Sequence, residues 1–105
     1  MISSNQTEID LGDVKLGESR HFSVQVTNTY NKTLAVGVAF GCSACTTGGF
    51  YPDNNIAPEG ARTLNLKFTP TATGLQAKTV RLTYLPPSTN KAVKLVIRFK
   101  ANVIE

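Results

Sequence analysis

The chain has 105 residues, of which 41% are hydrophobic and 17% are charged, and its formal net charge is +4. This length predicts one domain over residues 1–105, with enough apolar side chains for a single core. The positive charge favours encounters with acidic surfaces, but it is too small to indicate nucleic acid as a partner.

Membrane insertion is not expected. No apolar run approaches the roughly 18 residues that a spanning helix needs, so we expect no membrane partner. The first eight residues have neither a basic start nor an apolar stretch, which argues against a secretory signal. We therefore expect the protein in the cytoplasm or in a virion.

The first part of the chain predicts three strands. We expect a short strand at residues 8–11, a turn bounded by Gly12 and Gly17, and a strictly alternating strand at residues 20–28. A third strand is expected at residues 34–40. The side chains expected to point inward from the second and third strands are Phe22, Val24, Val26, Leu34, Val36, Val38 and Phe40.

The second part begins with a loop at residues 41–49 that leads to a short strand at Phe50 and Tyr51. In the turn at residues 56–60 we expect Gly60 to take a positive φ. Further strands are expected at about residues 64–68, 78–84 and 92–102. Their inward side chains are Leu64, Leu66, Phe68, Val80, Leu82, Tyr84, Val93, Leu95, Ile97, Phe99 and Ala101.

Strand-like segments thus recur about every ten residues, and no window has helical periodicity. This pattern is typical of an all-β, seven-stranded antiparallel Ig-like β-sandwich, with a small β-barrel as the alternative. The antibody type is excluded because the chain has no Trp and neither Cys lies on the second or sixth expected strand.

Several short motifs follow one another in an order known from one group of domains. They are Ile9–Glu18 (Ile-x-Leu-Gly-x-Val-x-Leu-Gly-Glu), Phe22–Asn28 (Phe-x-Val-x-Val-x-Asn), Lys32–Leu34, Cys45–Thr46, Ile56–Gly60 and Leu66–Pro70. In this respect the chain resembles Hydin-type domains, which are relatives of major sperm protein and of the PapD chaperone fold. It is also similar to a bacterial family of Ig-like domains of unknown function. The resemblance covers about residues 8–103 and implies a non-catalytic module for scaffolding and partner binding.

Cys42 and Cys45 form a Cys-x-x-Cys motif. The bacterial relatives tend to have Cys-x-Cys-Thr at this loop, so the role of their tighter motif does not carry over directly. A redox pair usually needs a helix N-terminus to lower the thiol pKa, and no helix is expected here. A zinc site needs about four ligands, and His21 is the sole His. The remaining interpretation is a local disulfide or two small, partly buried thiols.

We expect no catalytic residues, and we predict that the protein is not an enzyme. His21 falls on the outward phase of its strand, with no nucleophile and orienting acid beside it in the sequence. The carboxylates are scattered, and no pair has the arrangement that acid/base chemistry needs. No cofactor is expected.

A basic stripe is the best candidate surface. Lys94, Arg98 and Lys100 share the outward face of the last expected strand, and Arg81 lies on the same side of the preceding strand. Four cations on one sheet face suit an acidic peptide or a neighbouring subunit, although lysines also serve to keep strand edges soluble. Because no aromatic residue is interleaved with them, nucleic acid is not expected here.

We therefore expect a structural or protein-docking module, either a subunit of a larger assembly such as a phage virion or a cytosolic scaffold. The expected partners are proteins. Two alternatives stay open. One is a thiol-redox or zinc protein that uses Cys42 and Cys45. The other is a carbohydrate-binding sandwich that uses aromatic residues near loops, namely Tyr30, Tyr51 and Phe50.

Overall fold

The computed structural model describes residues 1–42, 45–50, 53–87, 89 and 91–105, and all regular secondary structure in them is β-strand. The strands are β1 (Ile2–Ser4), β2 (Glu8–Lys15), β3 (Arg20–Asn28), β4 (Leu34–Ala35), β5 (Gly37–Phe40), β6 (Thr46–Gly49), β7 (Asn55–Ile56), β8 (Ala61–Phe68), β9 (Gly74–Tyr84) and β10 (Val93–Ile104). They exceed the seven expected strands because β1 and β7 were not expected and the strand at 34–40 is divided.

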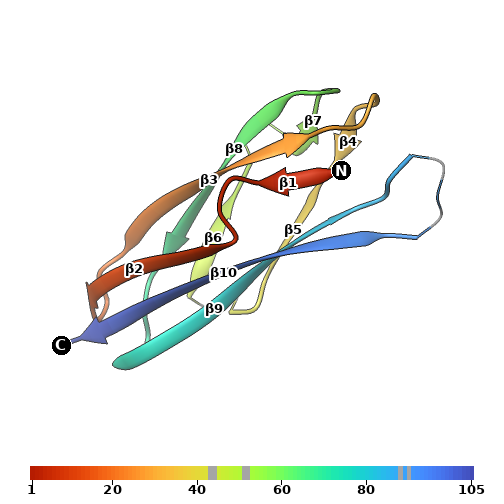
Figure 1. The fold of residues 1–105 in the computed structure, drawn as a ribbon. Helices are drawn as coiled ribbons and strands as arrows, with labels where there is room; N and C mark the ends of the chain where they lie inside the picture. The colour runs from red at the N-terminus through yellow and green to blue at the C-terminus, as the bar shows by residue number, and fades with distance from the viewer. Residues whose placement is uncertain (43–44, 51–52, 88, 90) are drawn as a thin grey trace.

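Two four-stranded sheets form the two layers of the molecule (Figure 1). Sheet A has the order β1-β3-β8-β6 and sheet B has the order β2-β10-β9-β5, while β4 and β7 pair separately. This arrangement confirms the Ig-like β-sandwich, and the described strands do not close into a barrel. One expectation was wrong: β10 pairs with β2 in parallel, so the sandwich is not purely antiparallel.

The core lies between the sheets and is filled by the alternating side chains that the sequence predicts to point inward. Phe99 is nearly fully buried at its centre, with ring centroids 5.0 Å from Phe22 and 5.3 Å from Phe68. Such tilted and edge-to-face pairs add to the stabilisation that comes from burial alone. Val93 departs from the prediction, because it stands beyond the end of the core and is 40% exposed.

The N-terminal segment crosses from one sheet to the other. Ile2 is buried on β1 in sheet A, and Asn5 continues that pairing by donating its N–H to the Gln25 carbonyl. Two residues later the Thr7 carbonyl accepts the Arg98 N–H, which places the chain in sheet B. β1 was not expected, because three residues are too few to show alternation.

The expected turn at Gly12 is a bulge within β2. Gly12 has a φ of 71°, and its N–H bonds to the Asp10 carboxylate. The register with β10 shifts here, so that Leu11 and Val14, three residues apart, are both buried. One extra residue therefore resets the inward phase, and the strand continues to Lys15 instead of ending at Leu11.

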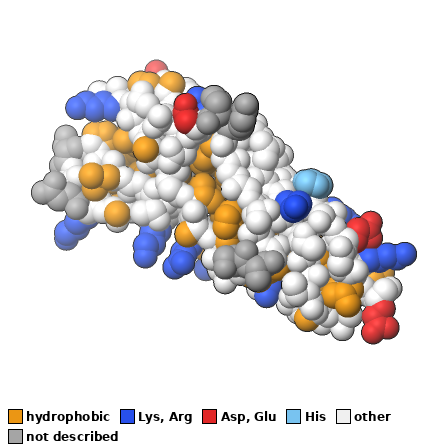
Figure 2. Space-filling view, turned by 180° about the vertical axis from the view of Figure 1, so that it is seen from behind, with side chains coloured by type: hydrophobic (Ala, Val, Ile, Leu, Met, Phe, Trp, Pro, Cys, Tyr) orange, Lys and Arg blue, Asp and Glu red, His pale blue; other side chains and the backbone are white. Residues whose placement is uncertain are grey.

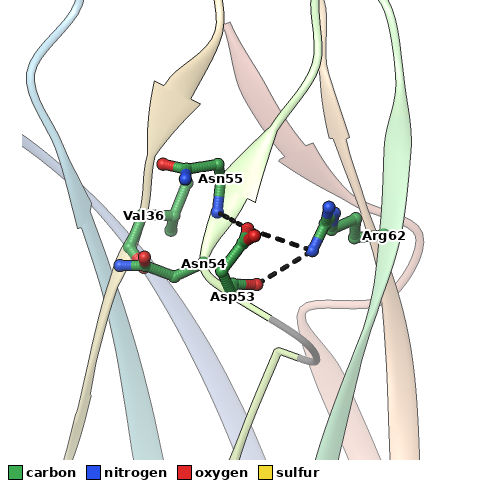
Figure 3. Close-up of polar contacts among 5 residues, drawn as sticks. All are labelled: Val36, Asp53, Asn54, Asn55 and Arg62. Atoms are coloured by element: carbon green, nitrogen blue, oxygen red, sulfur yellow. Dashed lines mark hydrogen bonds and ion pairs between the residues drawn. The ribbon is translucent and has the colours of Figure 1, made fainter.

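The strand at 34–40 is divided at Val36, whose backbone pairs with a different segment. Its N–H bonds to the Asn54 carbonyl, and its own carbonyl accepts from the Asn54 side chain at 3.1 Å. The turn at Asp53 is held by Arg62, which contacts both the Asp53 carbonyl (2.9 Å) and its carboxylate (3.2 Å) (Figure 3). These contacts anchor the segment that leads into β7.

Two local expectations were wrong. The short strand expected at Phe50 lies earlier, as β6, and Tyr51 falls outside the described residues. In the turn at 57–60, Glu59 takes the positive φ (56°) and Gly60 does not. The Gly60 N–H bonds to the Ala57 carbonyl, so Pro58 and Glu59 occupy the two central positions, and a type II turn requires positive φ at the second of these.

Asn28 is a buried polar residue whose side chain makes several hydrogen bonds, although the sequence suggested only that it ends a strand. Its side chain is fully buried. The amide nitrogen donates to the carbonyls of Lys32 and Ile56, and the amide oxygen accepts the Tyr30 N–H. This explains the Asn that closes the Phe-x-Val-x-Val-x-Asn motif.

Candidate protein-docking face

The four cations of the basic stripe lie on the outer face of sheet B. In the β9–β10 ladder Val96 stands opposite Arg81, so Arg81 shares its face with Lys94 and Arg98. Lys100 lies further along the same face, opposite Ala77. Lys and Arg side chains line the lower rim of the molecule in Figure 2. Sequence reasoning therefore placed these four residues together, and their docking role stays a prediction.

The structure divides this stripe into two halves. In the second half, β2 runs beside β10, with Glu8 opposite Arg98 and Asp10 opposite Lys100. The Lys100 ammonium and the Asp10 carboxylate are 4.0 Å apart, and both side chains are well exposed. Such an exposed pair contributes little to stability, but it lowers the local positive charge. The acidic strand was not anticipated as a neighbour of the stripe.

In the first half, Arg81 and Lys94 have no carboxylate within ion-pair distance among the described residues. The β2 register begins at Arg98, so no acidic residue of β2 reaches this part of the face. The positive charge that remains available to a partner is therefore concentrated around Val96, between Arg81 and Lys94.

The first half of β10 also has an open backbone edge. β10 pairs with β9 from Val93 to Val103, but it pairs with β2 from Arg98 onward. Figure 1 shows β2 following β10 at one end of the molecule while β1 lies in the other layer. Residues 93–97 thus have a partner strand on one side.

The hydrogen-bonding phase identifies which groups face the open side. The Arg98 N–H and the Ile104 carbonyl both bond toward the β2 segment, so even-numbered residues of β10 direct their backbone groups to that side. Lys94 and Val96 therefore point one N–H and one carbonyl each toward the open edge. Among the residues that the structure describes, no hydrogen bond from these groups to that side is found.

The outer edge of β2, in contrast, is blocked. The Arg20 guanidinium donates to the carbonyls of Leu11 (2.7 Å) and Asp13 (2.9 Å). This occupies two backbone carbonyls of β2, and the bulge at Gly12 further disturbs the edge that a further strand would use. The protein therefore protects one edge of sheet B with a side chain and leaves part of β10 open.

A shallow hollow of about 410 Å³ lies on the outer face of sheet B. Its walls come from β2 and β10, and Ala77 of β9 also lines it. The charged residues around it are Glu8, Asp10, Arg98 and Lys100. A smaller hollow of about 250 Å³ beside the exposed His21 on sheet A is lined by uncharged neighbours, Phe22, Ser23, Asn65 and Leu66. Neither arrangement brings a nucleophile, a base and an orienting acid together.

Cys42 and Cys45 are joined by a disulfide, with their Cα atoms 5.5 Å apart. Cys42 follows Gly41, whose N–H bonds to Thr79 of β9, whereas the Cys45 carbonyl accepts the Thr69 N–H. The pair therefore stands where the chain passes from sheet B to sheet A. Over the part of the chain that is described, no group of three or more His, Cys, Asp or Glu residues is placed to hold a metal ion.

The two described aromatic residues considered for carbohydrate binding, Phe50 and Tyr30, are each only partly exposed. Phe50 packs partly against the core, and Tyr51 lies outside the described residues. Tyr30 lies beside Tyr84, with ring centroids 6.2 Å apart. Desolvation raises the pKa of Tyr30 above its ordinary value, and the neighbouring Tyr84 adds to the shift.

None of the described segments forms a helix long and apolar enough to cross a membrane.

A family model described as protein of unknown function (DUF1573) matches residues 2–103. The chain belongs to this family. No curated protein sequence matches it.

Solved structures confirm the expected PapD-like and major-sperm-protein-like fold. The PapD-like domain 7 of human CEP192 superimposes with a TM-score of 0.78 at 12% identity, over 99% of this chain and 85% of that one. WR4, a major sperm protein family member of Caenorhabditis elegans, gives 0.66 at 11% identity, over 96% and 97%. The E. coli chaperone DraB gives 0.71 at 11% identity, over 98% of this chain and 55% of its own.

Two of the similar structures are Vibrio cholerae proteases, VesB and VesC. The VesB protease of Vibrio cholerae matches with a TM-score of 0.72 at 16% identity, over 96% of this chain. The chain spans about a third of that protease, 31% of its length. At these identities the likeness is one of fold, and the resemblance to Hydin-type domains in particular stays a prediction.

Proposed function

We propose that this protein is a non-catalytic docking module that binds a partner protein by accepting an extended segment along the first half of β10. The observation that carries the proposal is the half-paired strand, in which Lys94 and Val96 direct their backbone groups to an open edge. Adding a strand to such an edge is a common mode of peptide recognition. The PapD-like and major-sperm-protein folds of similar structures support a protein partner.

The number of free backbone groups at the open edge of β10 limits how much the backbone can contribute to binding. Lys94 and Val96 offer two donors and two acceptors. At about 0.5–1.5 kcal/mol net for each hydrogen bond, they contribute about 2–6 kcal/mol before the cost of association. The backbone alone therefore gives weak binding, and side chains on the face around Arg81 and Lys94 are needed for a stable complex. Such an interface suits a subunit of a larger assembly, such as a virion, or a module of a cytoplasmic scaffold.

The substitution Val96→Pro tests the strand-addition step. Because the Val96 N–H points away from β9, proline removes a donor from the open edge without removing one from the β9–β10 ladder. The matched control is Val96→Thr, which keeps the N–H and a β-branched side chain. We expect extended peptides selected from a random display library to bind the wild type and Val96→Thr and to lose binding to Val96→Pro.

A second measurement does not depend on the folding of a variant. Hydrogen exchange in the wild-type protein should show slower exchange of the Lys94 and Val96 amides when a selected peptide is added. If selected peptides bind Val96→Pro as tightly as the wild type, or leave both amides unprotected, the proposed function is wrong.

A further inference from the structure

We infer that the segment accepted along β10 is acidic, an extended run of about four to six residues that alternates carboxylates with apolar side chains. This inference rests on the proposed function, because it names the chemistry of the strand that would bind there. Its length follows from the open stretch at residues 93–97, since each strand residue spans about 3.3 Å.

The outer face favours negative charge in the added strand. A strand beside β10 would place its outward side chains about 5 Å from those of Lys94 and Val96. Lys94 has no carboxylate at ion-pair distance in the described part of the chain, and neither has Arg81, which stands across Val96. Carboxylates at alternate positions of the segment would therefore meet unbalanced cations.

The inner face favours apolar side chains. Val93 is 40% exposed, and Leu95 is half-buried and packs against the core. Both belong to the inward phase of β10, with Val93 opposite Tyr84. Apolar residues on the inward phase of the added strand would remove this surface from water. The two faces together define the alternating pattern.

A second copy of the chain is a poorer occupant of the same edge. If two β10 strands paired antiparallel around Val96, Lys94 of one copy would stand opposite Arg98 of the other, by the geometry of the strand. Like charges directly opposite each other destabilise strand pairing. Lysine on an open strand is also a common means of preventing self-association at edges. The charge pattern therefore favours a partner that supplies carboxylates.

The test compares three synthetic peptides of about eight residues, with Asp, Ser or Lys alternating with Val. Binding is measured by amide chemical shifts of the folded protein at about 50 mM and 300 mM salt. We expect the Asp peptide to bind at least about tenfold more tightly than the Ser peptide at low salt, and the difference to shrink at high salt. Lys94→Gln should weaken the Asp peptide, whereas Lys67→Gln, which removes one charge from the exposed face of sheet A, should not.

The outcomes separate this inference from the proposed function. If the Ser or Lys peptide binds as tightly as the Asp peptide and loses binding to Val96→Pro, strand addition stands and the acidic partner is wrong. If the Asp peptide binds Val96→Pro and the wild type equally, or if no peptide binds, both proposals fail.

Discussion

Asn28 offers the sharpest test of how this fold is held together. Its fully buried amide nitrogen lies 2.9 Å from the Lys32 carbonyl and 3.0 Å from the Ile56 carbonyl. Its amide oxygen lies 2.9 Å from the Tyr30 nitrogen. One side chain thus joins the end of β3 to the following turn and to β7.

Replacing Asn28 with Ala removes these three hydrogen bonds and a longer one to the Ala57 carbonyl at 3.4 Å, and it leaves buried backbone groups without partners. At about 0.5–1.5 kcal/mol net for each bond, the free energy of unfolding should fall by about 2–4 kcal/mol. A domain of this size has a total stability of about 5–15 kcal/mol, so the variant should fold but melt about 10–20 °C lower. Urea unfolding followed by circular dichroism measures the difference.

Asn28→Asp has nearly the same shape but depends on pH. The donor that faces the Lys32 and Ile56 carbonyls would become a carboxyl oxygen, which can donate only while protonated. Burial beside two carbonyls raises the folded-state pKa of this carboxyl above its ordinary value of about 3.9. Its contribution is therefore present below about pH 4 and is lost as the pH rises through the folded-state pKa.

We thus expect Asn28→Asp to be more stable, relative to the wild type at the same pH, at about pH 4 than at about pH 8. A loss below about 0.5 kcal/mol in Asn28→Ala, or an Asp variant whose relative stability is equal at both pH values, would refute the reasoning, because it would mean that these contacts do not carry the stability assigned to them.

Two further predictions concern strain and ionisation. Gly48 has a φ of 147°, and an added Cβ would lie 2.1 Å from the Asn65 carbonyl oxygen, so Gly48→Ala should lower the unfolding free energy by about 2 kcal/mol or more. Gly49→Ala is the matched control, since nothing lies within 4 Å of its Cβ position, and an equal loss in both would contradict the steric explanation. Because the folded-state pKa of Tyr30 is raised, Tyr30 should ionise above pH about 10, and stability should decline as the pH rises beyond that value. Absorbance titration of the wild type and of Tyr30→Phe checks this, because the difference between the two curves reports the ionisation of Tyr30. If that difference shows ionisation at the ordinary pKa of tyrosine, the assignment is wrong.

Local alternation explains why the sequence predicts most of the core. In β8 and the middle of β10 every second side chain is buried, as expected from a period of two. The same local reasoning fails where a single residue resets the phase, as at Gly12, and it does not show that the backbone of Val36 pairs with Asn54 while the inward phase continues. It also cannot identify β1, because the pairing of Ile2 with Asn28 depends on a strand far along the chain.

The sequence predicted which residues form the candidate site, but not which of its positive charges have a carboxylate opposite them. The outward phase of two strands is a local property, and it places Arg81, Lys94 and Arg98 on one face. That Glu8 stands opposite Arg98 depends on a parallel pairing between the first and last long strands, which no local pattern reveals. The division of the stripe into a balanced half and an unbalanced half could therefore be seen only in the structure.

The N-terminal crossing accounts for the open part of sheet B. A strand that stayed beside β10 for its whole length would cover residues 93–97 and leave no edge for a partner. Here the Thr7 carbonyl accepts the Arg98 N–H, but the residues before Thr7 lie in sheet A. There Ile2 is buried, and the Asn5 side chain accepts the Gln25 N–H at 2.9 Å. Sheet A thus stabilises the segment that would otherwise complete sheet B, and the exposed half of β10 is a consequence of how the fold begins.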